Sequence, residues 1–210
     1  MTGSETTAEG VAQLFDEAFE KKERLPRIFR VQVAEVEEDG KTGVALTCKG
    51  VRLGEPLVDY TYDEDDGYRY HDALHFAFAA LLGWSPVTRA LMRRRRRSVP
   101  KIFEVEDAGR AIAVEEGIVL LVLDYVRGRG FEGVERIDPG LLQTVKRLTD
   151  HLEVRDCSVS QWEHAILRGV ALWRELMAHR RGTLRGNLHQ RTILFVRTEE
   201  IALAVRQSPQ

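Results

Sequence analysis

The sequence predicts a mainly helical α+β protein, with a bundle of about five helices between an N-terminal and a C-terminal β-hairpin. Apolar residues recur with helical spacing through most of residues 66–180, which predicts the bundle. Alternating stretches bounded by turn residues precede and follow this part, which predicts the hairpins. A chain of 210 residues has the length of one domain and can bury a sizeable core. We therefore expect a flexible leader at residues 1–9 and a single domain at 10–200.

The N-terminal part of this domain, residues 10–58, is expected to hold a short helix followed by a hairpin. The stretch "GVAQLFDEAFEKKER" is amphipathic and ends before Pro26. Its apolar positions are Val11, Leu14, Phe15 and Phe19. The next stretch, "RIFRVQVAEVEEDGKTGVALTCKGVRL", alternates apolar and polar residues and turns at Asp39-Gly40, which is typical of a hairpin with one buried face.

The helical core follows an acidic loop at 59–67, in which Asp65 or Asp66 is expected to cap the first helix. Proline and serine at helix starts and glycine at helix ends set the predicted boundaries. The predicted helices lie at 68–82, from Ser85-Pro86 onward, at 102–127, at 138–152 and at 160–179, and the second hairpin lies at 182–197.

Composition narrows the compartment and the partners. The chain has 31 Lys+Arg against 33 Asp+Glu, a formal charge of −2, and no aromatic residues among its clustered arginines, so nucleic acid is not an expected partner. Its longest apolar run, "GIVLLVL" at 117–123, is far shorter than the roughly 18 residues of a membrane span. Only Cys48 and Cys157 occur, and the N-terminus lacks a secretory pattern. We expect a cytoplasmic protein that does not bind membranes.

The stretch "YRYHDALHFAF" places polar residues where burial is expected. At about 100° per residue, His71, Asp72 and His75 share one helix quadrant with apolar residues and therefore face inward. A buried carboxylate that lacks a partner costs several kcal/mol, so such groups bind a cation or become neutral. These residues predict a divalent-metal site, although core histidines that donate to backbone carbonyls are an open alternative.

The predicted helix at 102–127 would supply the other half of this site. Counted as one continuous helix, Glu104, Asp107 and Glu115 lie on its apolar stripe, whereas Glu106 points away. The i, i+3 spacing of Glu104 and Asp107 lets two carboxylates reach one ion, and the histidines favour Mn²⁺ over Mg²⁺. Helix-dipole stabilisation of Glu104 and Asp107, and an ion pair between Glu115 and an arginine, are the alternatives.

The arginine tract "RRRRR" at 93–97 wraps around a helix end, so its five charges cannot all face one ligand. We expect some of them to reach over the metal site and to hold a polyphosphate. The candidates are Arg93, Arg94, Arg97 and Lys101. A solvated helix terminus is the alternative.

Two long segments carry a family resemblance. "GYRYHDALHFAFAALLGWSPVTRALMRRRRRS" and "EVEDAGRAIAVEEG", extended by "LGEPLVDYTYDEDDGYR", resemble the domain at the C-terminus of bacterial MazG-like nucleotide pyrophosphohydrolases. Enzymes of that type are helical and split nucleoside triphosphates into monophosphate and pyrophosphate, with Mg²⁺ held by a Glu-x-x-Glu and a Glu-x-x-Asp pair. Glu104-x-x-Asp107 matches the second pair, and Asp72-x-x-His75 occupies the place of the first with a departure from two glutamates.

The resemblance implies a metal-dependent pyrophosphohydrolase with Mg²⁺ or Mn²⁺, in which Glu115 or Glu116 orients or deprotonates the attacking water. It also implies a homodimer. Two other functions stay open. One is a non-catalytic nucleotide-sensing or oligomerisation module. The other is an endoribonuclease of the HEPN type, because Arg174 and His179 have the Arg-x4-His spacing of that family.

Overall fold

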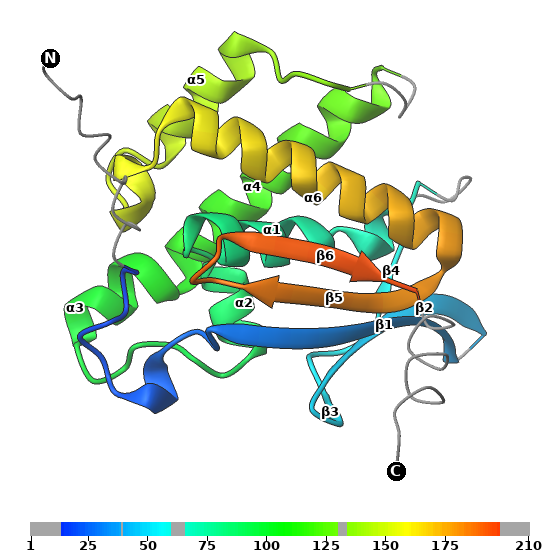
Figure 1. Ribbon diagram of the computed structural model, residues 1–210, viewed down its shortest axis with the longest axis horizontal. Coiled ribbons are helices and arrows are strands. Elements are labelled where there is room, and N and C mark those ends of the chain that lie inside the picture. The colour runs from blue at the N-terminus through cyan, green and yellow to red at the C-terminus, as the bar shows by residue number, and fades with distance from the viewer. Residues whose placement is uncertain (1–13, 39, 60–65, 130–133, 198–210) are drawn as a thin grey trace, which may run out of the picture.

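The computed structural model describes residues 14–38, 40–59, 66–129 and 134–197 (Figure 1). The predicted leader at 1–9, Val11, the turn residue Asp39 and the cap candidate Asp65 lie outside these residues. Asp66 is not the N-cap, which is Gly67 for the first 3-10 turn of the helical part and His71 for the helix after it, but its Oδ1 accepts a hydrogen bond from the Tyr68 N–H at 2.9 Å just before that turn. No helix among the described residues is long and apolar enough to cross a membrane.

A single six-stranded antiparallel sheet contains both predicted hairpins. Its strands are β1 (Ile28–Glu38), β2 (Lys41–Cys48), β3 (Val51–Arg52), β4 (Leu57–Val58), β5 (Arg181–Asn187) and β6 (Thr192–Val196). The order is β3-β2-β1-β5-β6, and β4 pairs with β2. The two hairpins join because β5 pairs with the free edge of β1, where Leu184 lies opposite Val31.

The prediction of a mainly helical bundle with two separate hairpins is therefore wrong. The chain has a mixed α+β fold with one large sheet and, among the described residues, five α-helices of six residues or more. Alternation within a strand predicts which face is buried, but it carries no information on which strand pairs with its second edge. That edge is filled here by a strand about 150 residues away in the sequence.

The sheet and the helices form two layers, with α1 (Asp72–Leu82) and α6 (Val159–His179) packed over one sheet face (Figure 1). The buried positions of β1, Phe29, Val31 and Val33, point toward these helices. Every residue of α1 is buried, so this helix is the centre of the core rather than an amphipathic surface helix. Polar side chains on α1 are consequently removed from bulk water.

Gly169 allows α1 and α6 to approach closely. A Cβ at this position would lie 3.2 Å from the Leu74 Cα and 3.1 Å from its Cγ. A larger residue would push the helices apart or force Leu74 to move, at a cost of about 1–3 kcal/mol. The sequence thus fixes α1 tightly between α6 and the sheet.

The segment before β1 does not form the predicted amphipathic helix within its described part, where the only helical element is a 3-10 turn, η1 (Lys21–Glu23). Asp16 explains the difference because its buried carboxylate accepts a hydrogen bond from the Leu25 N–H at 2.7 Å. Arg89 also binds Asp16, at 2.8 Å. These contacts hold the segment in an irregular turn against the core.

The predicted helix at 102–127 is broken. It consists of a short α3 (Pro100–Ile102), a π-helical turn η3 (Phe103–Asp107) and α4 (Gly109–Arg127), with Ala108 in an extended conformation between the last two. This break resets the helical phase, so that Glu106 is buried and Glu104 is exposed, the reverse of the predicted arrangement. π-helical turns of this kind recur at functional sites and at points of strain.

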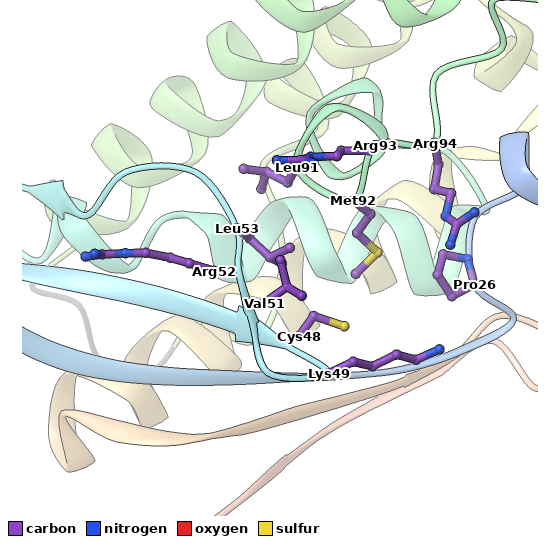
Figure 2. A pocket seen from close by; sticks show the side chains of 10 residues that line it. All are labelled: Pro26, Cys48, Lys49, Val51, Arg52, Leu53, Leu91, Met92, Arg93 and Arg94. Atoms are coloured by element: carbon purple, nitrogen blue, oxygen red, sulfur yellow. The ribbon is translucent and has the colours of Figure 1, made fainter.

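The remaining helices follow their predicted positions. Ser85 caps α2 (Pro86–Leu91) through a hydrogen bond from the Thr88 N–H. The other elements are α5 (Pro139–Leu148), α6, and the 3-10 turns η2 (Tyr68–Tyr70) and η4 (Glu153–Asp156). The end of α2 and the loop between β2 and β3 line a cavity of about 220 Å³ (Figure 2).

Candidate metal centre

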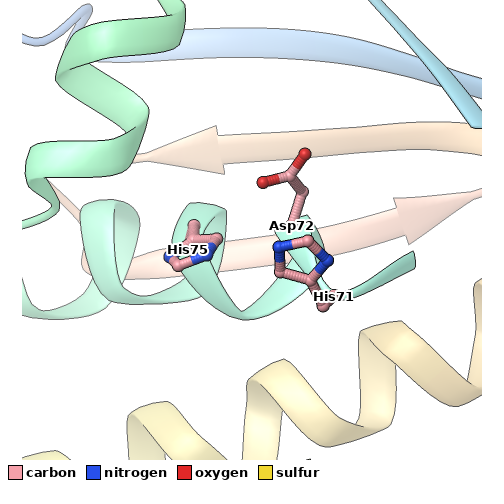
Figure 3. A group of neighbouring side chains, drawn as sticks. All are labelled: His71, Asp72 and His75. Atoms are coloured by element: carbon pink, nitrogen blue, oxygen red, sulfur yellow. The ribbon is translucent and has the colours of Figure 1, made fainter. Parts of the chain in front are cut away.

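The first turns of α1 bring His71, Asp72 and His75 together (Figure 3). Each offers one ligand atom, and these atoms all lie within 4.8 Å of one another. All three side chains are buried, with His75 fully inaccessible. The sequence-based expectation that these residues face inward is confirmed.

The start of α1 is fixed by contacts on the other side of the core. Trp173 of α6 donates a hydrogen bond from Nε1 to the Gly67 carbonyl at 2.8 Å. Gly67 has a φ of 70°, and a Cβ there would lie 2.5 Å from the Met177 Sδ, so only glycine fits this turn. The turn therefore aims the histidine side chains from a rigid position.

Helix α4 supplies two acids to the same cluster. The His75 Nδ1 lies 2.9 Å from the Glu115 Oε1. The Nε2 atoms of His75 and His71 lie 3.5 Å and 3.6 Å from the Glu116 Oε2. Two imidazoles from α1 thus converge on one carboxylate oxygen from α4.

The hydrogen bond of His71 uses its Nδ1 and leaves its Nε2 available as a ligand atom. Its Nδ1 lies 2.8 Å from the Tyr68 carbonyl, which can only accept, so Nδ1 carries the proton. Nε2 is then the ring nitrogen that can present a lone pair toward the cluster. Stacking on the Tyr68 ring, with centroids 4.2 Å apart, further fixes the imidazole.

His75 and Glu115 are buried without well-aligned hydrogen bonds between them. Among the residues that the structure describes, both ring nitrogens of His75 and the Glu115 Oε1 lack a hydrogen-bond partner, whereas the Glu115 Oε2 accepts a hydrogen bond from the Val87 N–H at 2.8 Å. Such unpartnered groups cost free energy, so the cluster requires a bound cation or a proton.

The electrostatics of the cluster favour positive charge. Burial opposes ionisation of His75, but the charge of Glu115 and the interaction with Glu116 outweigh it and raise the pKa of His75 to about 10. Burial would raise the pKa of Glu116, yet the two histidines hold it below its ordinary value. A metal ion would replace the His75 proton in the same negative field.

The residues fit a divalent transition metal. Distances of 3.5 and 3.6 Å exceed those of good hydrogen bonds. When four ligand atoms surround a cation tetrahedrally at about 2.1 Å, neighbouring ligand atoms are about 3.4 Å apart. The two observed distances are close to this separation. The contact of the His75 Nδ1 with Glu115 matches the way a carboxylate orients a metal-bound imidazole.

Two predicted ligands are not part of this cluster. Asp107 is fully buried, and the Arg96 backbone N–H and guanidinium donate to its carboxylate at 2.5 Å and 2.7 Å. Arg96 in turn binds Glu153 at 2.8 Å through two nitrogens. Glu104 is exposed. The prediction that Glu104 and Asp107 share one ion fails because the π-helical turn separates their side chains and an arginine neutralises Asp107.

The family model described as "MazG C-terminal domain" matches residues 10–199. The chain belongs to this family. Neither the curated proteins nor the solved structures compared with the chain gave a match. The resemblance inferred from the sequence is thus confirmed, and it points to a role connected with nucleotides.

In this MazG C-terminal domain, the arginine tract lies at the far end of α2 from the cluster. Val87 in the first turn of α2 contacts Glu115, whereas Arg93 and Arg94 beyond its last turn line the cavity of Figure 2. Six helical residues span about 9 Å, which separates the two places. Arg97 lies over the Phe103 ring, 5.2 Å from its centroid, and Lys101 is exposed on α3.

Sequence reasoning missed the burial of Glu106. Its Oε1 accepts a hydrogen bond from the Glu153 N–H at 3.0 Å, and its Oε2 has no partner. Burial, with the negative charge of Glu153, raises the pKa of Glu106 to about 7. Glu106 is buried because the π-helical turn shifts the helical phase, and the sequence does not indicate that turn.

The residues of the ribonuclease alternative lie on the last turns of α6. Arg174 is exposed, and His179 stacks on Phe195 with ring centroids 5.6 Å apart. This stacking gives His179 a packing role.

Proposed function

We propose that this domain is a metal-dependent nucleoside triphosphate pyrophosphohydrolase. One observation carries the proposal: two buried imidazole nitrogens and one carboxylate oxygen converge where buried polar atoms lack hydrogen-bond partners. Membership in the MazG C-terminal domain family supports a role connected with nucleotides. The reaction adds water to the α-phosphorus and breaks its bond to the pyrophosphate leaving group.

His71, Asp72, His75 and Glu116 would hold the metal in this proposal. Two imidazoles in the donor set favour Mn²⁺ or a similar ion over Mg²⁺, which prefers oxygen ligands. When bound, the metal would neutralise phosphate charge and acidify a water molecule.

The chain's own acids then have different tasks. Glu115 is fully buried and touches both His75 and the Val87 N–H, so it acts as a positioning residue that orients the imidazole. Glu116 has a side chain that is 33% exposed, and its lowered pKa keeps it ionised at neutral pH. It is therefore the acid that meets solvent and can accept a proton from the attacking water.

A homodimer would cover the open side of this cluster. Leu120 and Leu121 follow Glu116 on α4 and are 51% and 40% exposed. Leu120 lies about one turn after Glu116 and shares its helix face, and Leu121 extends the exposed apolar surface beside it. A second copy packed on this surface would shield the bound nucleotide from water.

A non-catalytic module is the second candidate. The pKa of His75 near 10 supports it, because an imidazolium between two carboxylates balances the cluster without a metal. In that case the cluster would serve stability only.

Pyrophosphate release separates these candidates. The purified domain is incubated with a panel of NTPs and dNTPs in Mn²⁺, in Mg²⁺ and in EDTA. We expect metal-dependent release that Glu116→Gln reduces at least ~100-fold, in line with the loss of one group in general acid–base catalysis. Glu104→Gln, which removes an exposed acid on the same chain segment, should retain full activity. Equal activity of both variants would contradict the proposed site.

A further inference from the structure

Three segments that are distant in sequence gather cations on one side of the molecule. They are the stretch around η1, the β2–β3 turn and the arginine tract after α2. Their side chains line three cavities of about 220, 450 and 510 Å³. The cationic lining residues are Lys21, Lys22, Arg24, Arg27, Lys49, Arg52, Arg93, Arg94, Arg95 and Arg97.

The three cavities adjoin one another because they share lining residues. Pro26, Lys49 and Arg94 line both the 220 Å³ and the 450 Å³ cavities. Arg93 lines both the 220 Å³ and the 510 Å³ cavities. Figure 2 shows the central one, with Lys49 and Arg94 on its rim. We call this run of cavities the basic groove.

The positive charge of the basic groove is largely uncompensated. Among the described residues, Glu23 is its only acidic lining residue, and it accepts hydrogen bonds from the Ser98 N–H and hydroxyl. Three of the ten cations pair with acids that do not line the groove: Lys22, Arg27 and Arg52. Within the part of the chain that the structure describes, the other seven, Lys49, Arg93 and Arg95 among them, form no ion pair. A net charge of −2 for the whole chain therefore hides a strongly cationic face.

The backbone holds two of these cations in an unusual conformation. Lys49 and Arg93 have φ values of 52° and 54°, the left-handed region that side chains other than glycine rarely adopt. At Lys49 the hairpin accounts for it, because Cys48 pairs with Val51 and the two residues between them, Lys49 and Gly50, both have positive φ. The Arg95 Nε is buried and lacks a hydrogen-bond partner.

We propose that the basic groove binds single-stranded nucleic acid through its phosphodiester backbone. Seven cations without an ion pair among the described residues exceed what one nucleotide could neutralise, which favours a chain of phosphates. The apolar floor of the central cavity, formed by Leu53, Leu91 and Met92, offers a surface for bases without reading their identity. A row of adjoining cavities can be followed by a flexible single strand more easily than by a stiff duplex. This proposal reverses the expectation from overall charge.

Fluorescence anisotropy with a labelled oligothymidylate of about 20 nucleotides tests this groove, with KCl varied from about 50 to 200 mM. EDTA is present throughout, so that the measurement does not depend on the metal cluster or on hydrolysis. We expect binding whose log K falls with log salt by about 0.7 for each phosphate contacted. The triple variant Lys49→Gln, Arg93→Gln, Arg95→Gln should weaken binding at least ~10-fold and reduce the slope by about 2.

Glutamine keeps the backbone strain at Lys49 and Arg93 nearly unchanged, so the variant tests charge. The matched control is Arg136→Gln, Arg155→Gln, Arg174→Gln, which removes three exposed charges outside the groove. It should bind like the wild type. Thermal unfolding of both triple variants verifies that they are folded. If the triple variant of the groove is unfolded, the single variant Arg95→Gln replaces it.

Equal loss in both triple variants would overturn the proposal, because binding would then follow net charge. Tighter binding of a duplex of the same length, or the absence of salt-dependent binding by the wild type, would overturn it as well. Loss of pyrophosphohydrolase activity has no bearing on this outcome.

Discussion

Two buried clusters in this domain compensate the negative charge of their carboxylates in different ways. In the arginine network, Asp107 is matched by Arg96 and approached by Arg89, which also binds Asp16. In the histidine cluster, the ion-pair partners of Glu115 and Glu116 among the described residues are imidazoles alone. Guanidinium groups are permanently charged, so the charges of the first cluster are balanced without a ligand, although the Arg89 Nε and the Asp16 Oδ1 have no hydrogen-bond partner among the described residues.

The histidine cluster, by contrast, pairs its acids with imidazoles, whose charge can change, and keeps one acid, Glu116, at the solvent boundary. Imidazole exchanges a proton for a metal ion, which guanidinium cannot do. The comparison shows that buried acids near each other are not equivalent. The chemistry of their partner decides whether they stabilise the fold or are available to a ligand.

The largest effect is expected from Asp107→Asn. This change leaves Arg96 and Arg89 buried with less compensation, and breaking a buried pair costs about 3–5 kcal/mol. Urea unfolding measures the loss. Asp124→Asn, at an exposed acid on α4, should change stability by less than about 0.5 kcal/mol. If both variants are equally stable, the network is not a structural element.

The histidine cluster should respond to metal instead. After EDTA treatment, Mn²⁺ at about 100 times its dissociation constant should stabilise the wild type by about 2.7 kcal/mol. Thermal unfolding monitors this gain, which Glu116→Gln should remove.

Glu104→Gln is the matched control for this metal response, since Glu104 is an exposed acid outside the cluster. It should respond to Mn²⁺ like the wild type. An unchanged response of Glu116→Gln would show that the metal binds elsewhere.

Glu106, which lies beside Glu153 of the arginine network, should make stability depend on pH. Its pKa rises from 4.5 to about 7 on folding, so the folded state retains a proton that the unfolded state has lost. Stability therefore falls as pH rises from about 4.5 to 7 and is constant above. Glu106→Gln should stabilise the domain at pH 8 on the order of 1 kcal/mol, or about 2–4 °C in Tm. Parallel pH profiles for the variant and the wild type would contradict this assignment.

The sequence predicts which side chains face inward in one part of the histidine cluster but not in the π-helical turn. Local spacing predicted that His71, Asp72 and His75 face inward, because a continuous helix preserves its phase. The same count failed for Glu104 and Glu106, since the π-helical turn and the extended Ala108 interrupt the phase. No local pattern could indicate these.

Long-range pairing was equally hidden. Both hairpins were predictable from alternation and turn residues, but their union through β1 and β5 was not. The pairing of Arg96 with Asp107, and the gathering of three cationic segments into one groove, also depend on contacts made only in the folded chain.

The smallest effect is expected at the end of α6. Arg174→Ala and His179→Ala remove the pair that the ribonuclease hypothesis requires, but neither residue contacts the histidine cluster or lines the basic groove. Pyrophosphate release and oligothymidylate binding should therefore remain at wild-type levels, with at most a small loss of stability from the stacking of His179 on Phe195. RNA cleavage in EDTA that disappears in His179→Ala would instead assign the chemistry to α6, and the unpartnered donors of the histidine cluster would then need only a proton.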